Sequence, residues 1–218
     1  IRRLAPRLAR RPIDELVHNA GALPDRRMLT GDGLETTFAA HVVGPHLLTR
    51  RLAPAFAAGA RVIWVSSGGM YTQRLSLADL DWTQRPYDGV RAYAQTKRMQ
   101  VVLSELWAAR LRRRGVLVNA MHPGWADTAG VRSALPLFHR LTRAILRTPA
   151  EGADTIVWLA ASPAAGRVSG AFFLDRQPRA THYLPFTRES AADRRALWAL
   201  CERLAKRMGK QMGKQMGT

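Results

Sequence analysis

Short apolar runs that alternate with helix-patterned stretches limit what this chain can fold into more than any other feature of its sequence. This alternation is typical of strand–helix units, whose strands join in a parallel sheet. The 218 residues fit one domain that is large enough to bury a core. The sequence therefore predicts an α/β fold with a doubly wound parallel sheet, with strands at the apolar runs 13–19, 61–67, 116–121 and 171–174.

Capping residues and apolar periodicity predict helices between these strands. Asp32, followed three residues later by Glu35, predicts a helix start with a capping box, and Pro45 should kink this helix before it ends near Gly59. Further helices are expected over 91–114, from Thr148 onward and over 190–207. We expect 1–207 to form the domain, and the repeated Met-Gly-Lys-Gln within 208–218 predicts a disordered, low-complexity tail.

The composition argues against several classes of protein. No apolar run approaches the roughly 18 residues that a membrane span needs. The single cysteine, Cys201, cannot form an internal disulfide, which agrees with a reducing, cytoplasmic location. The six histidines lack the paired spacing of metal ligands, so no metal site is expected.

The net charge of +18 raises the question of nucleic-acid binding, because a basic surface attracts phosphate polymers. Arginine supplies nearly all of this charge and is spread along the chain, since lysine occurs only at positions 97, 206, 210 and 214. No alternation of aromatic and basic residues, which would stack bases, accompanies it. We therefore expect a solvated, arginine-rich surface and no nucleic-acid partner.

Tyr93 and Lys97 form the pair with the clearest chemical potential. At a spacing of four residues, the phenol and the ammonium share one face of the predicted helix over 91–114. A phenol with a pKa near ~10 is a poor acid–base catalyst at neutral pH, and a fixed positive neighbour lowers that pKa. Taken alone, the pair is better explained as a surface tyrosine and a surface lysine.

Polar and glycine-containing turns follow three of the predicted strands. Ser67 ends the strand over 61–67, Asn19-Ala20-Gly21 closes the first strand, and Pro123-Gly124 follows the third. Open α/β sheets bind their ligands at the carboxyl ends of their strands. A serine there can donate to a carbonyl oxygen, and a Pro-Gly turn lets backbone approach a flat ligand. A helix cap at Ser67 and an ordinary turn at Pro123-Gly124 are the plainer alternatives.

The four elements in the order strand-NAG, strand-SS, helix-YxxxK and strand-PGxxxT resemble the short-chain dehydrogenase/reductase family. The resemblance extends from about residue 8 to residue 173. The runs VSSGGM, YAQTK, MHPGWADT and EGADTIVWL look most like the member-twelve branch, akin to retinol dehydrogenases. The resemblance implies a Rossmann-like oxidoreductase that interconverts an alcohol and a carbonyl with NAD or NADP.

The resemblance also implies roles for individual residues. Tyr93 would be the general acid/base, Lys97 would lower its pKa and hold the nicotinamide ribose, and Ser67 would orient the substrate oxygen. His41 stands where the family usually has an asparagine that holds a proton-relay water, so it is either a substitute in the relay or a core histidine with a satisfied partner. The implied cofactor-binding residues are Asn19, Ala20, Gly21, Tyr93, Lys97, Pro123, Gly124, Trp125 and Thr128.

The glycine-rich turn that seats a dinucleotide's pyrophosphate should precede the NAG strand, and the sequence has no match to it. We therefore interpret the chain as N-terminally truncated relative to the family, lacking the first strands and that turn. Because the NAG strand would pair with a missing strand, we expect an exposed sheet edge and a chain that is marginally stable and prone to aggregate. The sequence does not choose between NAD and NADP.

Two functions remain open from the sequence. The first is an oxidoreductase acting on a small, apolar alcohol or carbonyl, because apolar residues gather in 68–90 and 122–147. The second is a non-catalytic or truncated relative that acts as a binding or scaffold protein. A homo-oligomer is compatible with either, since the family often pairs through the helix that bears YxxxK.

Overall fold

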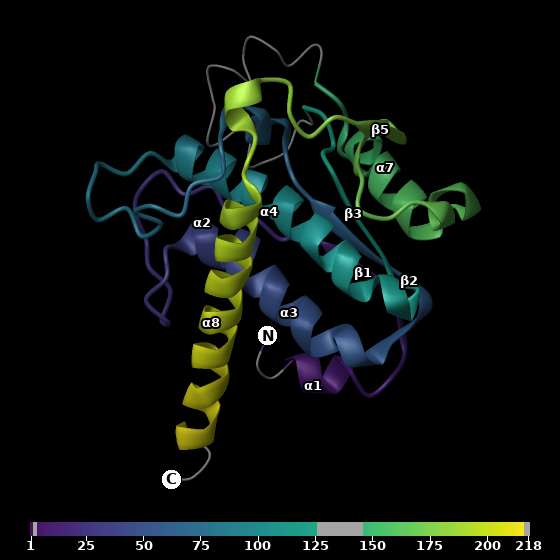
Figure 1. The fold of residues 1–218 in the computed structure, drawn as a ribbon, viewed down its shortest axis with the longest axis horizontal. Helices are drawn as coiled ribbons and strands as arrows, with labels where there is room; N and C mark the ends of the chain where they lie inside the picture. Colours follow the sequence, from purple (N-terminus) through teal and green to yellow (C-terminus); the bar gives the residue numbers. More distant parts are fainter. Residues whose placement is uncertain (2–3, 126–145, 216–218) are drawn as a thin grey trace.

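The computed structural model describes residues 1, 4–125 and 146–215, which form an α/β fold around a five-stranded sheet (Figure 1). The strand order is β1-β2-β3-β4-β5, and only β5 runs antiparallel to its neighbour. The sequence predicts a parallel sheet, and the structure confirms an α/β fold with a mostly parallel sheet, to which β5 adds an unpredicted antiparallel strand. The strands are β1 (Ile13–His18), β2 (Phe56–Val65), β3 (Leu117–Met121), β4 (Phe172–Leu174) and β5 (Gln177–Arg179).

Helices of three kinds connect and cover these strands. The α-helices are α1 (Leu4–Leu8), α2 (Thr36–Phe38), α3 (Gly44–Leu52), α4 (Gly89–Leu111), α7 (Pro149–Ala161) and α8 (Ala191–Gln215). A π-helical turn, η1 (Ala39–Val43), joins α2 to α3. The 3₁₀ turns are η2 (Ala53–Ala55), η3 (Gly68–Thr72), η4 (Arg112–Arg114), η5 (Pro163–Arg167) and η6 (Pro185–Thr187). Within the described ranges, no helix is both long and apolar enough to span a membrane.

Apolar side chains project from both faces of the sheet, and helices cover each face. On β2, Val62 and Trp64 belong to a core shared with α3, α4 and α8. The alternate residues Ile63 and Val65 belong to a second core that contains Leu159 of α7. Successive side chains of a strand point to opposite faces, so one continuous apolar run fills two cores. This arrangement explains why residues 62–65, within the strand predicted at 61–67, are all apolar and do not alternate.

The segment between β1 and β2 differs from the single kinked helix predicted from its sequence. Glu35, and not Asp32, caps this segment, because its buried carboxylate accepts the N–H groups of Thr37 and Phe38. The chain then widens into the π-turn η1 before Pro45. Proline cannot donate a backbone hydrogen bond and crowds the preceding turn, and a π-turn accommodates that disruption. A wider turn thus precedes Pro45, and the kink expected at Pro45 stays a prediction.

Several predicted helix ends are confirmed. Gly115, with a left-handed φ of 68°, follows the three arginines of η4. Thr148 and Glu151 form the predicted capping box at the start of α7. Helix α8 extends to Gln215, past the predicted end near 207, and Met208 is buried in the core. The division of the chain into a domain and a tail at residue 207 stays a prediction.

Strand β1 forms one edge of the sheet. In the described part of the chain it pairs with β2 alone, as expected for the NAG strand. Its Val17 side chain is 38% exposed. An edge strand with an exposed apolar side chain is a template for pairing with another molecule.

Replacing Val17 by lysine should therefore raise the protein concentration at which the chain begins to self-associate, because a charge on an edge strand opposes intermolecular pairing. Light scattering against concentration measures this threshold. The matched control is Val157→Lys, since Val157 is 61% exposed on helix α7 and lies on no sheet edge. An equal rise in both variants would show that added charge, and not the strand edge, controls association.

Candidate active site

The carboxyl ends of β1, β2 and β3 lie side by side. His18 is in register with Trp64, and Val65 with Met121, so the residues that follow the three strands emerge next to one another. These are the residues 19–21, 66–67 and 122–125 that the sequence singles out. A shared edge of this kind is where open α/β sheets bind their ligands.

Ser67 and Tyr93 meet at this edge. Ser67 is the N-cap of η3, where its Oγ accepts the Gly69 N–H at 3.3 Å. Its side chain also hydrogen-bonds the half-buried Tyr93 side chain, which lowers the pKa of Tyr93, while burial raises that pKa by more. The net direction is upward, so the phenol is protonated at neutral pH. The sequence-based expectation of a lowered Tyr93 pKa does not hold for this structure.

Lys97 follows Tyr93 by one helical turn and is 3% exposed. Its Nζ lies 5.2 Å from the centre of the Tyr93 ring and donates to the Val65 carbonyl oxygen at 2.9 Å. Burial lowers the pKa of Lys97 to about 7, because little water remains to solvate the ammonium. The buried Lys97 thus lies close to Tyr93, but burial also reduces the fraction of Lys97 that carries the positive charge expected to act on Tyr93.

A further hydrogen bond fixes α4 against β2. The Ser66 hydroxyl donates to the Lys97 backbone carbonyl at 2.9 Å and is buried. Of the two serines at the end of this strand, Ser66 therefore holds the helix, and Ser67 is the one that contacts the Tyr93 side chain.

His41 lies in the π-turn η1, beside Tyr93, and is fully buried. The ring planes of His41 and Tyr93 are nearly perpendicular, with centres 5.3 Å apart. His41 Nε2 accepts the Ala22 backbone N–H at 3.0 Å, so Nδ1 carries the proton and donates to Thr96 Oγ1 at 2.8 Å. Burial, followed by the charge of Lys97, holds the pKa of His41 well below its usual range. His41 is a neutral bridge between the turn after β1 and α4.

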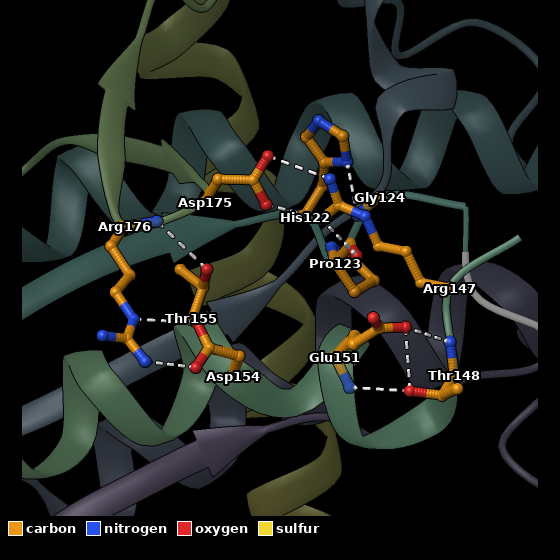
Figure 2. Close-up of polar contacts among 10 residues, drawn as sticks. All are labelled: His122, Pro123, Gly124, Arg147, Thr148, Glu151, Asp154, Thr155, Asp175 and Arg176. Carbon is orange, nitrogen blue, oxygen red and sulfur yellow. Dashed lines mark hydrogen bonds and ion pairs between the residues drawn. The ribbon is translucent and has the colours of Figure 1, made fainter. Parts of the chain in front are cut away.

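The Pro123-Gly124 turn follows β3 and is braced by three side chains (Figure 2). The Gly124 N–H donates to His122 Nδ1 at 3.1 Å, and Gly124 has a left-handed φ of 76°. Arg147 donates to the Pro123 carbonyl at 3.3 Å and forms two hydrogen bonds with Asp175. Trp125 is exposed, and the predicted site residue Thr128 lies outside the described residues.

Comparison with known proteins gives the family. A family model described as enoyl-(acyl carrier protein) reductase matches residues 6–174, which is most of the chain. The chain belongs to the short-chain dehydrogenase/reductase family. It is 47% identical over 88% of its length to human dehydrogenase/reductase SDR family member 12, and 31% identical over 87% to human retinol dehydrogenase 14. It spans 61% and 58% of the lengths of these relatives.

Solved structures give the same fold. An uncharacterized protein from Mycobacterium paratuberculosis superposes with a TM-score of 0.71 at 27% identity, over 93% of this chain and 71% of that one. A short-chain dehydrogenase from Burkholderia cenocepacia, in complex with NADP, gives a TM-score of 0.61 at 23% identity, over 79% of this chain and 68% of that one. The second likeness is evidence for the fold alone.

The residues at this edge fit the nicotinamide half of the family's cofactor. Lys97 Nζ makes one hydrogen bond within the described part of the chain, so its other N–H groups remain for a ligand hydroxyl. Gly124 has a left-handed φ of 76°, and Asn19, Ala20 and Gly21 are exposed. The described residues hold no glycine-rich turn for a pyrophosphate.

Sequence reasoning missed three residues of the site. His122, Arg147 and Asp175 brace the Pro123-Gly124 turn, but Arg147 and Asp175 are far from it in sequence and carry no motif. His122 directly precedes the turn, and its position was the one available signal. Across the described ranges, no three or more His, Cys, Asp or Glu side chains gather as a metal site.

Gly21→Ala should lower the free energy of unfolding by about 1–3 kcal/mol, because the new Cβ would lie 2.9 Å from His41 Nε2, whose ring is held at both nitrogens. Chemical denaturation measures the change. Gly31→Ala is the matched control, since a Cβ there meets nothing within 4 Å. In a His41→Asn background the cost of Gly21→Ala should shrink, and an unchanged cost would show that His41 is not the obstacle.

The contribution of Lys97 to stability should rise with pH between about 7 and 10.5, its folded and ordinary pKa values, because at this group the unfolded chain binds more protons in that window. The slope from this group is at most about 1.4 kcal/mol per pH unit. Lys97→Met should remove this rise, and Lys206→Met, at an exposed lysine of α8, should retain it. Parallel profiles for wild type and Lys97→Met would contradict the buried, partly neutral state of Lys97.

Proposed function

We propose that this chain carries the catalytic part of an NAD(P)-dependent oxidoreductase that interconverts an alcohol and a carbonyl. The observation that carries the proposal is the convergence of Ser67, Tyr93 and Lys97 at the carboxyl edge of a parallel sheet. Membership of the short-chain dehydrogenase/reductase family supports the same reaction class.

Tyr93 is the proposed general acid/base. Its raised pKa keeps the phenol protonated at neutral pH, so in the reducing direction it can give its proton to a carbonyl oxygen as negative charge develops there. Ser67, hydrogen-bonded to Tyr93, can donate to the same oxygen and align it. In the oxidising direction the alcohol proton returns to Tyr93.

Lys97 is the proposed source of positive charge beside Tyr93. Its ammonium lies near the Tyr93 ring and stabilises the phenolate that proton donation leaves behind. The bound nicotinamide would supply or accept the hydride. Residues at the strand ends would hold this cofactor: Asn19, Ala20, Gly21, Tyr93, Lys97, Pro123, Gly124 and Trp125, with Thr128 in the same motif.

The choice between NAD and NADP stays open in this proposal. The Burkholderia cenocepacia neighbour is in complex with NADP, which makes NADPH the first dinucleotide to test. The chain spans less than two thirds of its curated relatives, so cofactor binding is a property to measure on this chain and on the whole protein.

The proposed substrate is a small, apolar alcohol or carbonyl. A row of aromatic rings beside η3 supports it: Tyr71 lies 4.4 Å from Tyr183 and 6.0 Å from Phe172 between ring centres, and His122 stacks on Phe172. The relatives named as retinol dehydrogenases support an apolar alcohol as well. A cytoplasmic location, the absence of a nucleic-acid partner and homo-oligomer formation remain predictions.

The second candidate is a non-catalytic binding or scaffold protein. One observation favours it: both ring nitrogens of His41 are occupied by Ala22 and Thr96, so His41 has no ring nitrogen left for the family's relay water. Under this candidate the site would bind a dinucleotide or apolar ligand without turnover. Turnover measurements therefore separate the two functions.

Titration with NADPH and NADH, followed by cofactor fluorescence, tests the proposal first. We expect micromolar binding of one dinucleotide and reduction of aliphatic or isoprenoid carbonyls. Tyr93→Phe should retain binding and lower turnover by at least about 100-fold, because it removes the proton donor.

Tyr87→Phe is the matched control for Tyr93→Phe. Tyr87 hydrogen-bonds Glu35 and lies outside the proposed site, so its loss should leave turnover close to wild type. Binding without turnover in the wild type would favour the scaffold candidate. Absence of binding to either dinucleotide would overturn the oxidoreductase proposal for this polypeptide.

A further inference from the structure

Arg147 contacts the Pro123-Gly124 turn through its side chain, as Figure 2 shows. Its Nη1 donates to the Pro123 carbonyl at 3.3 Å, and its backbone N–H donates to the Trp125 carbonyl at 2.8 Å. The guanidinium lies against Gly124 so closely that a Cβ there would be 2.7 Å from Arg147 Cζ. The turn is thus covered on one side by a planar cation.

Asp175 holds this guanidinium in place. Its two carboxylate oxygens accept hydrogen bonds from Nη1 and Nη2 of Arg147 at 2.5 and 2.9 Å. A paired Arg–carboxylate contact fixes orientation as well as distance. Arg147 and Asp175 are 32% and 49% exposed, and ion pairs exposed to this degree add little to global stability. The pair is therefore suited to fixing a local geometry more than to stabilising the fold.

The turn that carries Asp175 is itself strained and braced. Asp175 and Arg176 join β4 to β5, with left-handed φ values of 53° and 58°. Arg176 pairs with Asp154 of α7, and its backbone N–H donates to Thr155 Oγ1 at 3.2 Å. The Arg176 and Asp154 side chains are 52% and 43% exposed, so their ion pair adds little, and the backbone hydrogen bond to Thr155 is the contact that holds this turn.

We propose that Arg147 is a positioning residue: held by Asp175, it fixes the Pro123-Gly124 turn and, through it, the nicotinamide ring that this turn contacts. The inference rests on the proposed function for its last step. Its first step, the fixing of the turn, stands on the contacts of this chain alone. Loss of the pair should leave the fold intact and let the Gly124 N–H separate from His122 Nδ1 more often.

Hydrogen exchange at the Gly124 amide tests the first step without cofactor. Asp175→Asn and Arg147→Gln should each speed this exchange about tenfold or more, because the amide is protected by a local contact. The matched control is Asp154→Asn, which breaks the neighbouring Arg–Asp pair and leaves the contacts of Arg147 with the turn in place. Its Gly124 exchange should stay close to wild type, while the melting temperatures of all three variants should be similar.

Kinetics test the second step. Asp175→Asn should lower kcat roughly ten- to hundredfold with a smaller change in the KM for the alcohol or carbonyl, because misplacement of a reacting ring affects the chemical step most. Asp154→Asn should leave both constants near wild type. Equal effects of Asp154→Asn and Asp175→Asn on exchange or on kcat would overturn the proposal, since they would show general loosening of the β4–β5 turn.

The failure of this inference can be told apart from the failure of the proposed function. If wild type binds neither dinucleotide, the proposed function and the link to the nicotinamide both fail, and the exchange result still decides whether Arg147 fixes the turn. If wild type binds and turns over but Asp175→Asn leaves Gly124 exchange unchanged, the proposed function stands and the role of Arg147 is refuted.

Discussion

The hydrogen bond from Lys97 Nζ to the Val65 carbonyl joins the chemistry of this protein to its fold. It connects α4, which carries Tyr93, to the end of β2, which Ser66 and Ser67 follow. A second hydrogen bond, from the Ser66 hydroxyl to the Lys97 backbone carbonyl, connects the same two elements. Because both contacts are buried, the helix cannot shift along the strand without leaving a polar group unsatisfied. These two hydrogen bonds between α4 and the end of β2 therefore fix the distance between the Tyr93 phenol and Ser67.

Burial at this junction has opposing electrostatic consequences. It raises the pKa of Tyr93 and lowers that of Lys97 to about 7, so both groups are driven towards their neutral forms. A ligand that hydrogen-bonds the ammonium would favour its charged form again, and a charged Lys97 would in turn favour the Tyr93 phenolate. Under the proposed function, ligand binding and proton transfer would therefore depend on each other.

Much of the fold could be predicted from the sequence, because its signals are local. The apolar run at β2, the capping box at Thr148 and the glycine at the end of η4 each depend on a few adjacent residues. The motif residues were found in the same way. The bridging role of His41 could not be predicted, since its partners Ala22 and Thr96 are 19 and 55 residues away. The sequence predicts Asp32 as the cap and Glu35 as its capping-box partner, and only the folded chain shows that the Glu35 carboxylate is the one buried at the helix start.

The β4–β5 hairpin was missed for a reason that also bears on its role. Two-residue hairpins with left-handed φ at both central positions favour Asn-Gly or Asp-Gly, and this one is Asp175-Arg176. The arginine raises the energy of the turn relative to glycine, and the hydrogen bond from its backbone N–H to Thr155 Oγ1 helps to offset that cost. A hairpin needed only to reverse the chain would form more readily with glycine. The turn places the Asp175 carboxylate within reach of Arg147, beside the Pro123-Gly124 turn.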